Sequence, residues 1–167
     1  NPILSEIQTP GALYFKDIET EFFNQTESIN MGLYELTEDD AGRLFVDVYY
    51  DFFRYNTTSK GWMVWASNRF TPDKWNLAER AAALIAKHIQ IKMIDMDVEN
   101  LKDAANFVKK IRSSSGIRAI LFFASADPRV VTSQEDYDKN PHLINTPLGV
   151  YEHLTGVLRN HRRDDLM

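Results

Sequence analysis

The chain contains no cysteine among its 167 residues. That absence excludes disulfide bonds, thiolate nucleophiles and zinc sites built on sulfur, and it is consistent with a reducing compartment. No run approaches the roughly 20 apolar residues that a membrane-spanning helix needs, and no secretory signal peptide is recognisable. We therefore expect a cytoplasmic protein that has no membrane partner.

The sequence also lacks the motifs of nucleotide and nucleophile chemistry. Glycine is scarce, with 7 residues, and there is no Gly-x-x-x-x-Gly-Lys-Ser/Thr loop to hold a phosphate. No serine stands in a Gly-x-Ser-x-Gly elbow. Three histidines lie near the C-terminus, but a hairpin turn at Thr155–Gly156 would pair His153 with Leu158 and Val150 with His161. The imidazoles of His153 and His161 would then be too far apart to bind the same metal ion. We predict no catalytic, cofactor or metal-binding residues in this chain.

Basic residues are in the minority, because 24 acids against 19 lysines and arginines give a net charge of −5. A domain that holds DNA alone through phosphate contacts is usually basic. Two local basic runs stand out all the same. The candidate contacts to DNA or to a neighbouring domain are Lys109, Lys110, Arg112, Arg159, Arg162 and Arg163. Three interpretations stay open for them: solvated surface, ion pairs with a neighbouring domain or subunit, and phosphate contacts.

Aromatic residues make up 12% of the chain, and several gather between residues 53 and 70. Trp62 and Trp65, with Phe53, Tyr55 and Phe70, could stack on single-stranded bases. Alternation along a strand puts the two tryptophans on opposite faces, so at least one should pack in the core. Trp62 is kept as a candidate DNA contact.

The hydrophobic pattern predicts an α+β fold, with central helices flanked by a small aromatic-rich antiparallel meander and a C-terminal β-hairpin. Thr37 should cap a helix that runs to about residue 49. Three further helices are expected. The first covers 77–89, the second runs from a cap at Asp97 to Ile111 and is stopped by the serines at 113–115, and the third is a buried helix over 117–126. The expected strands are 53–56, 62–65, 69–71, 143–145, 150–154 and 157–159. Residues 1–36 are predicted to be an N-terminal arm or linker and 37–167 the domain proper.

Two separated blocks resemble one family. The first runs from Thr37 to Asp73 and includes the acidic helix start, Gly61-Trp62-Met63-Val64-Trp65 and Arg69-Phe70-Thr71-Pro72-Asp73. The second, Asn140 to Asp165, includes Asn140-Pro141-His142-Leu143-Ile144-Asn145 and the Thr155-Gly156 hairpin. Together they resemble the collar domain that precedes the superfamily 3 helicase core in phage, plasmid and poxvirus-type DNA primase–helicases. The chain departs from the pattern at Asp40-Ala41-Gly42-Arg43 and at Leu148-Gly149, which leaves the scaffold interpretation intact.

The resemblance implies a non-catalytic accessory domain that supports assembly or orientation of a helicase ring and contacts DNA during replication. Its partners would be a downstream ATPase domain, sister subunits of the ring and single-stranded DNA. ATP and Mg²⁺ would belong to that ATPase domain, and the parent would be an ATP-dependent helicase or primase in a bacterial host cytoplasm. A stand-alone single-stranded DNA-binding module is the alternative. A hydrolase built from scattered carboxylates and histidines has no motif behind it.

Overall fold

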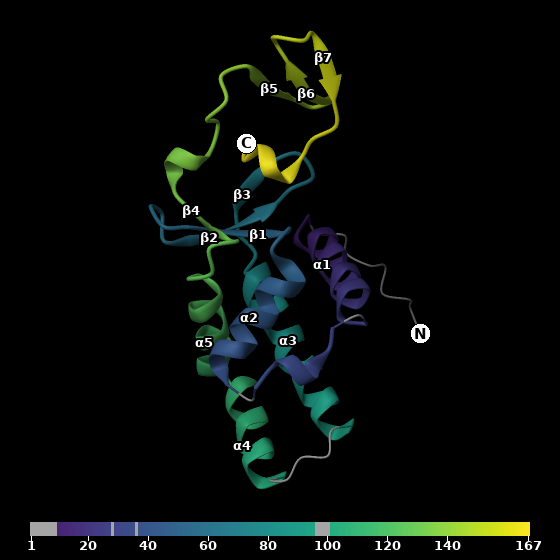
Figure 1. The fold of residues 1–167 in the computed structure, drawn as a ribbon, viewed down its shortest axis with the longest axis vertical. Helices are drawn as coiled ribbons and strands as arrows, with labels where there is room; N and C mark the ends of the chain where they lie inside the picture. The colour runs from purple at the N-terminus through teal and green to yellow at the C-terminus, as the bar shows by residue number, and fades with distance from the viewer. Residues whose placement is uncertain (1–9, 28, 36, 96–100) are drawn as a thin grey trace, which may run out of the picture.

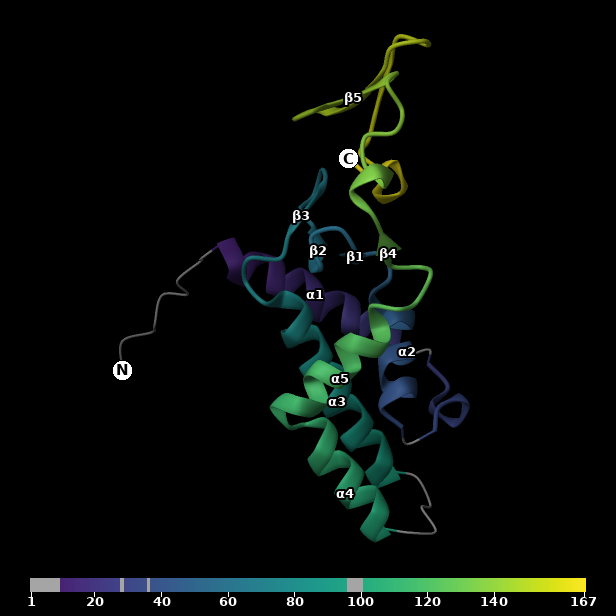
Figure 2. The same ribbon diagram turned by 90° about the vertical axis from the view of Figure 1, so that its left-hand side faces the viewer.

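The structure is a computed structural model that describes residues 10–27, 29–35, 37–95 and 101–167. Its helices are α1 (Pro10–Thr26), α2 (Glu38–Tyr49), α3 (Leu77–Asp95), α4 (Leu101–Ile111) and α5 (Ser114–Ala124). Its strands are β1 (Phe53–Asn56), β2 (Gly61–Trp65), β3 (Phe70–Pro72), β4 (Val131–Thr132), β5 (Leu143–Thr146), β6 (Gly149–Glu152) and β7 (Val157–Arg159). The helices occupy one end of an elongated molecule, β1–β4 cross its middle, and β5–β7 project at the other end (Figure 1, Figure 2). The predicted α+β fold is confirmed.

Helix α2 is the centre of the core. Thr37 caps it as predicted, since its hydroxyl accepts the amide of Asp40 at 3.1 Å, and the acids of the first turn suit the positive end of the helix dipole. Leu44 and Phe45 are fully buried. Helices α1, α3 and α5 pack around α2. The approach of α5 requires a glycine, because a Cβ on Gly42 would lie 2.7 Å from that of Phe123.

The aromatic meander forms as predicted and is extended by one strand. β1, β2 and β3 are antiparallel, and β2 pairs with both of its neighbours. The sequence did not indicate β4, which pairs with β1 in parallel and gives the strand order β3-β2-β1-β4. Phe53 and Val64 face each other across β1 and β2 and are buried against the helices.

Helix α1 packs against the domain through its buried face. Ile18 and Phe22 belong to the same hydrophobic core as α2. They lie one turn apart on one side of the helix, whereas Phe23 on the other side is mostly exposed. The segment predicted as an arm or linker therefore contributes a helix that completes the core.

Two details of the helical prediction are corrected. Helix α4 ends at Ile111, before the serines, as predicted. The next helix was predicted over 117–126, but Ser113 caps α5 by accepting the amide of Gly116, so α5 begins at Ser114 and ends at Ala124. Helix α5 is also not buried all round, because Phe122 is 70% exposed. Its apolar character had suggested a helix enclosed by the core, but only one face contacts α2, α3 and α4. The Asp97 cap lies outside the described residues.

The C-terminal strands form a three-stranded antiparallel sheet in the order β5-β6-β7. The predicted register is wrong by two residues: Val150 pairs with Arg159, not with His161. The reason is that the turn between β6 and β7 contains four residues, 153–156, where the prediction assumed two. Gly149 has φ +150°, and a Cβ there would lie 2.3 Å from the carbonyl oxygen of Arg159. The tight step before β6 therefore depends on glycine.

Candidate nucleic-acid and domain interfaces

Arg159 is held within the chain by two carboxylates. Its guanidinium donates to Glu152 at 2.7 Å and, through two nitrogens, to Asp165 at 2.7 Å. These contacts raise the pKa of Arg159, chiefly through Asp165 and then Glu152. In turn, Arg159 lowers the pKa of both carboxyls. Arg159 thus ties β6 and β7 to the C-terminal turn, and its side chain is mostly covered.

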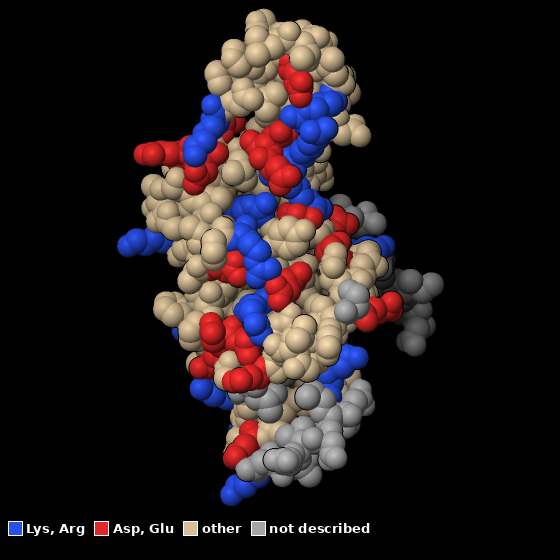
Figure 3. Space-filling view, in the orientation of Figure 1, with Lys and Arg blue, Asp and Glu red and all other residues tan. Residues whose placement is uncertain are grey.

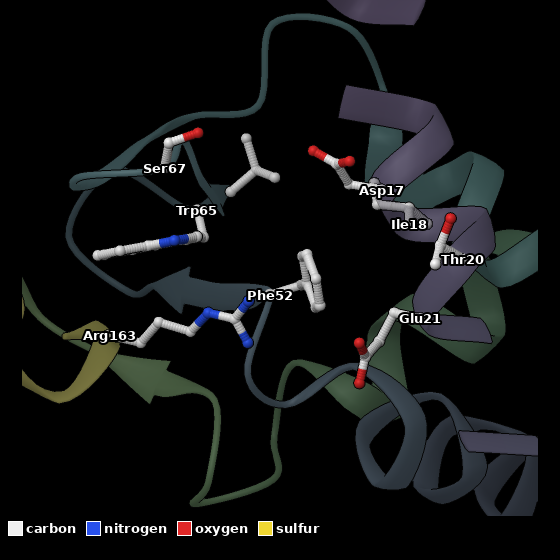
Figure 4. Close-up of a pocket in the computed structure, with 9 residues that line it drawn as sticks. Asp17, Ile18, Thr20, Glu21, Phe52, Trp65, Ser67 and Arg163 are labelled. Carbon is white, nitrogen blue, oxygen red and sulfur yellow. The ribbon is translucent and has the colours of Figure 1, made fainter. Parts of the chain in front are cut away.

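Arg163 anchors the C-terminal segment to the body of the domain. Its guanidinium lies 3.2 Å from Asp51 and 4.3 Å from the centre of the Phe52 ring. It lines a pocket of about 310 Å³ in which Asp17 and Glu21 come from α1 (Figure 4). A phosphate would meet three carboxylates there, so this geometry favours an internal anchor over a nucleic-acid contact.

The other predicted cations have different surroundings. Lys110 pairs with Glu38 at 3.0 Å, and Arg112 donates to Gln90 at 2.6 Å. Lys109 and Arg112 border an apolar groove of about 750 Å³ between α3 and α4. Arg162 is exposed. The structure therefore does not bring the six predicted cations together, and the face in Figure 3 shows the two signs of charge interleaved.

Trp62 packs on the core more than it faces solvent. Its ring makes edge contacts with Phe45 at 5.5 Å and with Tyr55 at 5.4 Å between centroids, and it is only partly exposed. Trp65, on the opposite face of β2, meets Phe70 at 5.2 Å. Both tryptophans therefore pack against neighbouring aromatic rings and are only partly exposed, which leaves little ring surface for a base.

The projecting sheet carries an apolar face that the described chain leaves uncovered. Ile144, Tyr151 and Leu158 are direct cross-strand neighbours, so they lie on one face of the sheet. Ile144 and Leu158 are both half-exposed, and Leu148 at the first turn is 84% exposed. Val150, on the other face, is the one fully buried apolar residue of this sheet and lies outside the main core cluster. A sheet with so small a core of its own is suited to contact with another protein surface.

A second surface lies where this C-terminal segment meets β3. It is a groove of about 580 Å³ whose floor contains Phe70, Pro72 and Tyr137. Arg69 and Lys74 stand at its rim, one before and one after β3, and both are exposed. Trp75 also lines it and is 37% exposed. The groove thus combines aromatic rings with cations.

Of the residues that line this groove, the sequence analysis had considered only Phe70 as a possible base-stacking ring. Arg69 was noted only within the resemblance, and Lys74, Trp75 and Tyr137 were not singled out. The local run Arg69 to Trp75, in which two cations alternate with two aromatic residues, is the signal that could have pointed to it. Tyr137 joins the run only through tertiary structure, where its hydroxyl lies 3.1 Å from that of Thr132.

His88 is a buried core residue. It lies on the apolar face of α3, with the ring of Phe22 at 5.5 Å, and its Nε2 is buried without a partner. Burial lowers the pKa of His88, and Lys92 lowers it further. This environment favours the neutral imidazole and fits a core residue.

Within the described ranges, no group of three or more histidine and acidic side chains is placed to hold a metal ion. His161 instead contacts the carbonyl oxygen of Thr146 at 2.8 Å. No helix among the described residues is long and apolar enough to cross a membrane.

One known protein family matches most of this chain. The family described as D5 N terminal like matches residues 42–167, which are three quarters of the chain. It is a family of non-catalytic domains. No curated protein and no solved structure matches the chain. Because the match covers the first resembling block from Gly42 onward, all of the second block and the helices between them, the chain belongs to the D5 N terminal like family, the N-terminal domains of D5-type primase–helicase proteins.

Proposed function

We propose that this chain is an accessory domain of a phage- or plasmid-type DNA primase–helicase, and that it supports assembly or orientation of the helicase ring. The family match over residues 42–167 carries the proposal. In this scheme, ATP and Mg²⁺ are bound by a downstream ATPase domain, and the protein acts in the cytoplasm of a bacterial host. The parent enzyme, and not this domain, performs the chemistry.

The exposed face of the C-terminal sheet supports a contact with the ring. Ile144, Tyr151 and Leu158 present apolar surface beyond the main core, and Arg159 and Arg163 fix the sheet and its C-terminal turn in place. Burying such a stripe against a neighbouring domain or subunit would remove apolar surface from water at about 25 cal/mol per Å². The sheet is therefore the surface by which we expect the domain to meet the ATPase domain or a sister subunit.

The test uses the parent protein and compares two apolar surfaces. The double change Ile144→Ser and Leu158→Ser should lower the fraction of ring-sized particles in light scattering and reduce ATP-dependent unwinding. Phe122→Ser removes an even more exposed apolar side chain from α5, a helix at the other end of the molecule from the sheet (Figure 1), and should leave both unchanged. If both variants reduce ring formation and unwinding equally, or if the double change has no effect, the sheet is not the surface that contacts the ring.

The reading frame beyond Met167 separates this proposal from a stand-alone DNA-binding module. An accessory domain of a helicase requires a phosphate-binding loop within about one domain's length downstream. A stop codon directly after Met167 would contradict the proposal and favour the stand-alone module.

A further inference from the structure

We propose that the groove beside β3 binds single-stranded nucleic acid, with Arg69 and Lys74 contacting phosphates and Trp75 stacking on a base. The inference deepens the proposed function, because it names a surface by which the accessory domain would contact DNA. None of the cations that the sequence patterns selected belongs to this surface.

The floor of the groove is fixed by the fold. Phe70 is paired with Trp65 and Pro72 with Met63 across β2 and β3, and the guanidinium of Arg54 lies 4.9 Å from the centre of the Phe70 ring. The opposite wall is tied to β3, because the amide of Phe70 donates to the main-chain oxygen of Met167 at 3.0 Å. A groove preformed in this way binds without the cost of ordering its own walls.

The charges at the rim favour an anionic ligand. Within the described part of the chain, the side chains of Arg69 and Lys74 make no ion pair, and Asp138 is the only acidic side chain that lines the groove. In the 167-residue chain, the terminal carboxyl group of Met167 lies there as well. Arg159 and Arg163, by contrast, are engaged by carboxylates of the chain itself. The cations available to a phosphate in this region therefore flank the groove, although the chain as a whole is acidic.

The lining also suits bases more than an acidic peptide. Trp75 offers a partly exposed indole and Tyr137 a partly exposed phenol ring, whereas Phe70 is buried beneath them. The amides of Asn68 and Gln134 line the same groove and can both donate to and accept from base edges. Its volume of about 580 Å³ lies within the range of small-ligand sites, about 300–1,000 Å³. Aromatic platforms beside a basic track are how sequence-tolerant binding of single strands is achieved.

The test measures binding of a fluorescein-labelled oligothymidylate to the 167-residue chain by anisotropy at salt concentrations from 50 to 200 mM. Each phosphate contact on a single strand contributes about −0.7 to the slope of log K against log salt. The double variant Arg69→Ala and Lys74→Ala should therefore make the slope shallower by about 1.4. Arg162→Ala is the matched control, since Arg162 is an exposed arginine outside the groove, and its slope should equal that of the unaltered chain.

Trp75 provides a second, independent readout. Stacking on a base should quench indole fluorescence, and Trp75→Leu should abolish that quenching and weaken binding about five- to 150-fold. Thermal melting confirms that each variant is folded. Absence of binding at 50 mM salt would overturn the proposal. So would a change of the salt slope in Arg162→Ala and not in the groove variant. A third contrary result is a polyglutamate peptide that displaces the oligonucleotide while Trp75→Leu leaves binding unchanged. None of these outcomes bears on ring assembly, so the inference can fail while the proposed function stands.

Discussion

Ile18→Ala tests whether α1 is part of the folded domain. Ile18 is 1% exposed and belongs to the core cluster around α2. The change removes three carbon atoms, at about 0.8 kcal/mol each by transfer from water, and it leaves a cavity that adds to this loss. We expect a destabilisation of about 3 kcal/mol, within the usual range of about 2–5 kcal/mol for such changes. In a chain of this length, that corresponds to a melting temperature lower by about 6–12 °C.

Phe23→Ala is the control on the same helix. Phe23 is 64% exposed, and its edge contact with Phe22, at 5.6 Å between ring centroids, limits the expected loss to less than about 1 kcal/mol. Urea denaturation followed by circular dichroism gives both free energies of unfolding. If Ile18→Ala costs no more than Phe23→Ala, then α1 is not docked in solution. The boundary predicted at residue 36 would in that case separate an arm from the domain.

Three further predictions concern the C-terminal sheet and the core histidine. Gly149→Ala should cost more than about 1 kcal/mol in urea denaturation, because alanine must adopt a φ of +150° and its Cβ would meet Arg159. Arg159→Met should speed amide exchange in β6. Because Arg159 lowers the pKa of Asp165, its stabilising effect is present above about pH 3.9 and disappears as the pH falls through the folded pKa. The pKa of His88 is lowered in the folded protein, so below about pH 6.5 the unfolded chain binds more protons than the folded one, and the free energy of unfolding decreases as the pH falls. His88→Leu should make this decrease smaller in thermal melts between pH 7.5 and 5.5.

Local signals in the sequence were sufficient for most of the elements. The Thr37 cap, the apolar stripe that begins at Leu77 and the alternation in β1 and β2 each depend on residues within one element. What the sequence could not indicate depends on contacts between distant segments. The two residues of β4 form a strand only because β1 lies beside them. The two segments are far apart in the sequence: Thr57, just after β1, donates to the carbonyl of Thr132, which lies 75 residues later.

The candidate site shows the same division. Clustering in the sequence selected Arg159, Arg162 and Arg163 as one basic run, but the fold gives them different roles. A carboxylate pair engages Arg159, an aspartate and a ring hold Arg163, and Arg162 alone of the three is exposed. Sequence distance cannot reveal that Glu152 and Asp51 come within reach of these arginines, because the register of β6 and β7 and the path of the C-terminal turn decide it.

Both proposed surfaces depend on the same few anchors. The wall of the groove that faces β3 contains Tyr137 and Met167, and the chain between them forms the projecting sheet. Besides backbone contacts, that segment is held to the body by Arg163 on Asp51 and Phe52, and by the amide of Asn145 on the carbonyl of Asn68 at 3.1 Å. Arg159 and Arg163 therefore contribute by fixing where the groove and the sheet lie, because carboxylates of the same chain pair with them. An acidic domain can then still offer a local site for an anion, because Arg159 and Arg163 are neutralised internally while Arg69 and Lys74 line the proposed groove.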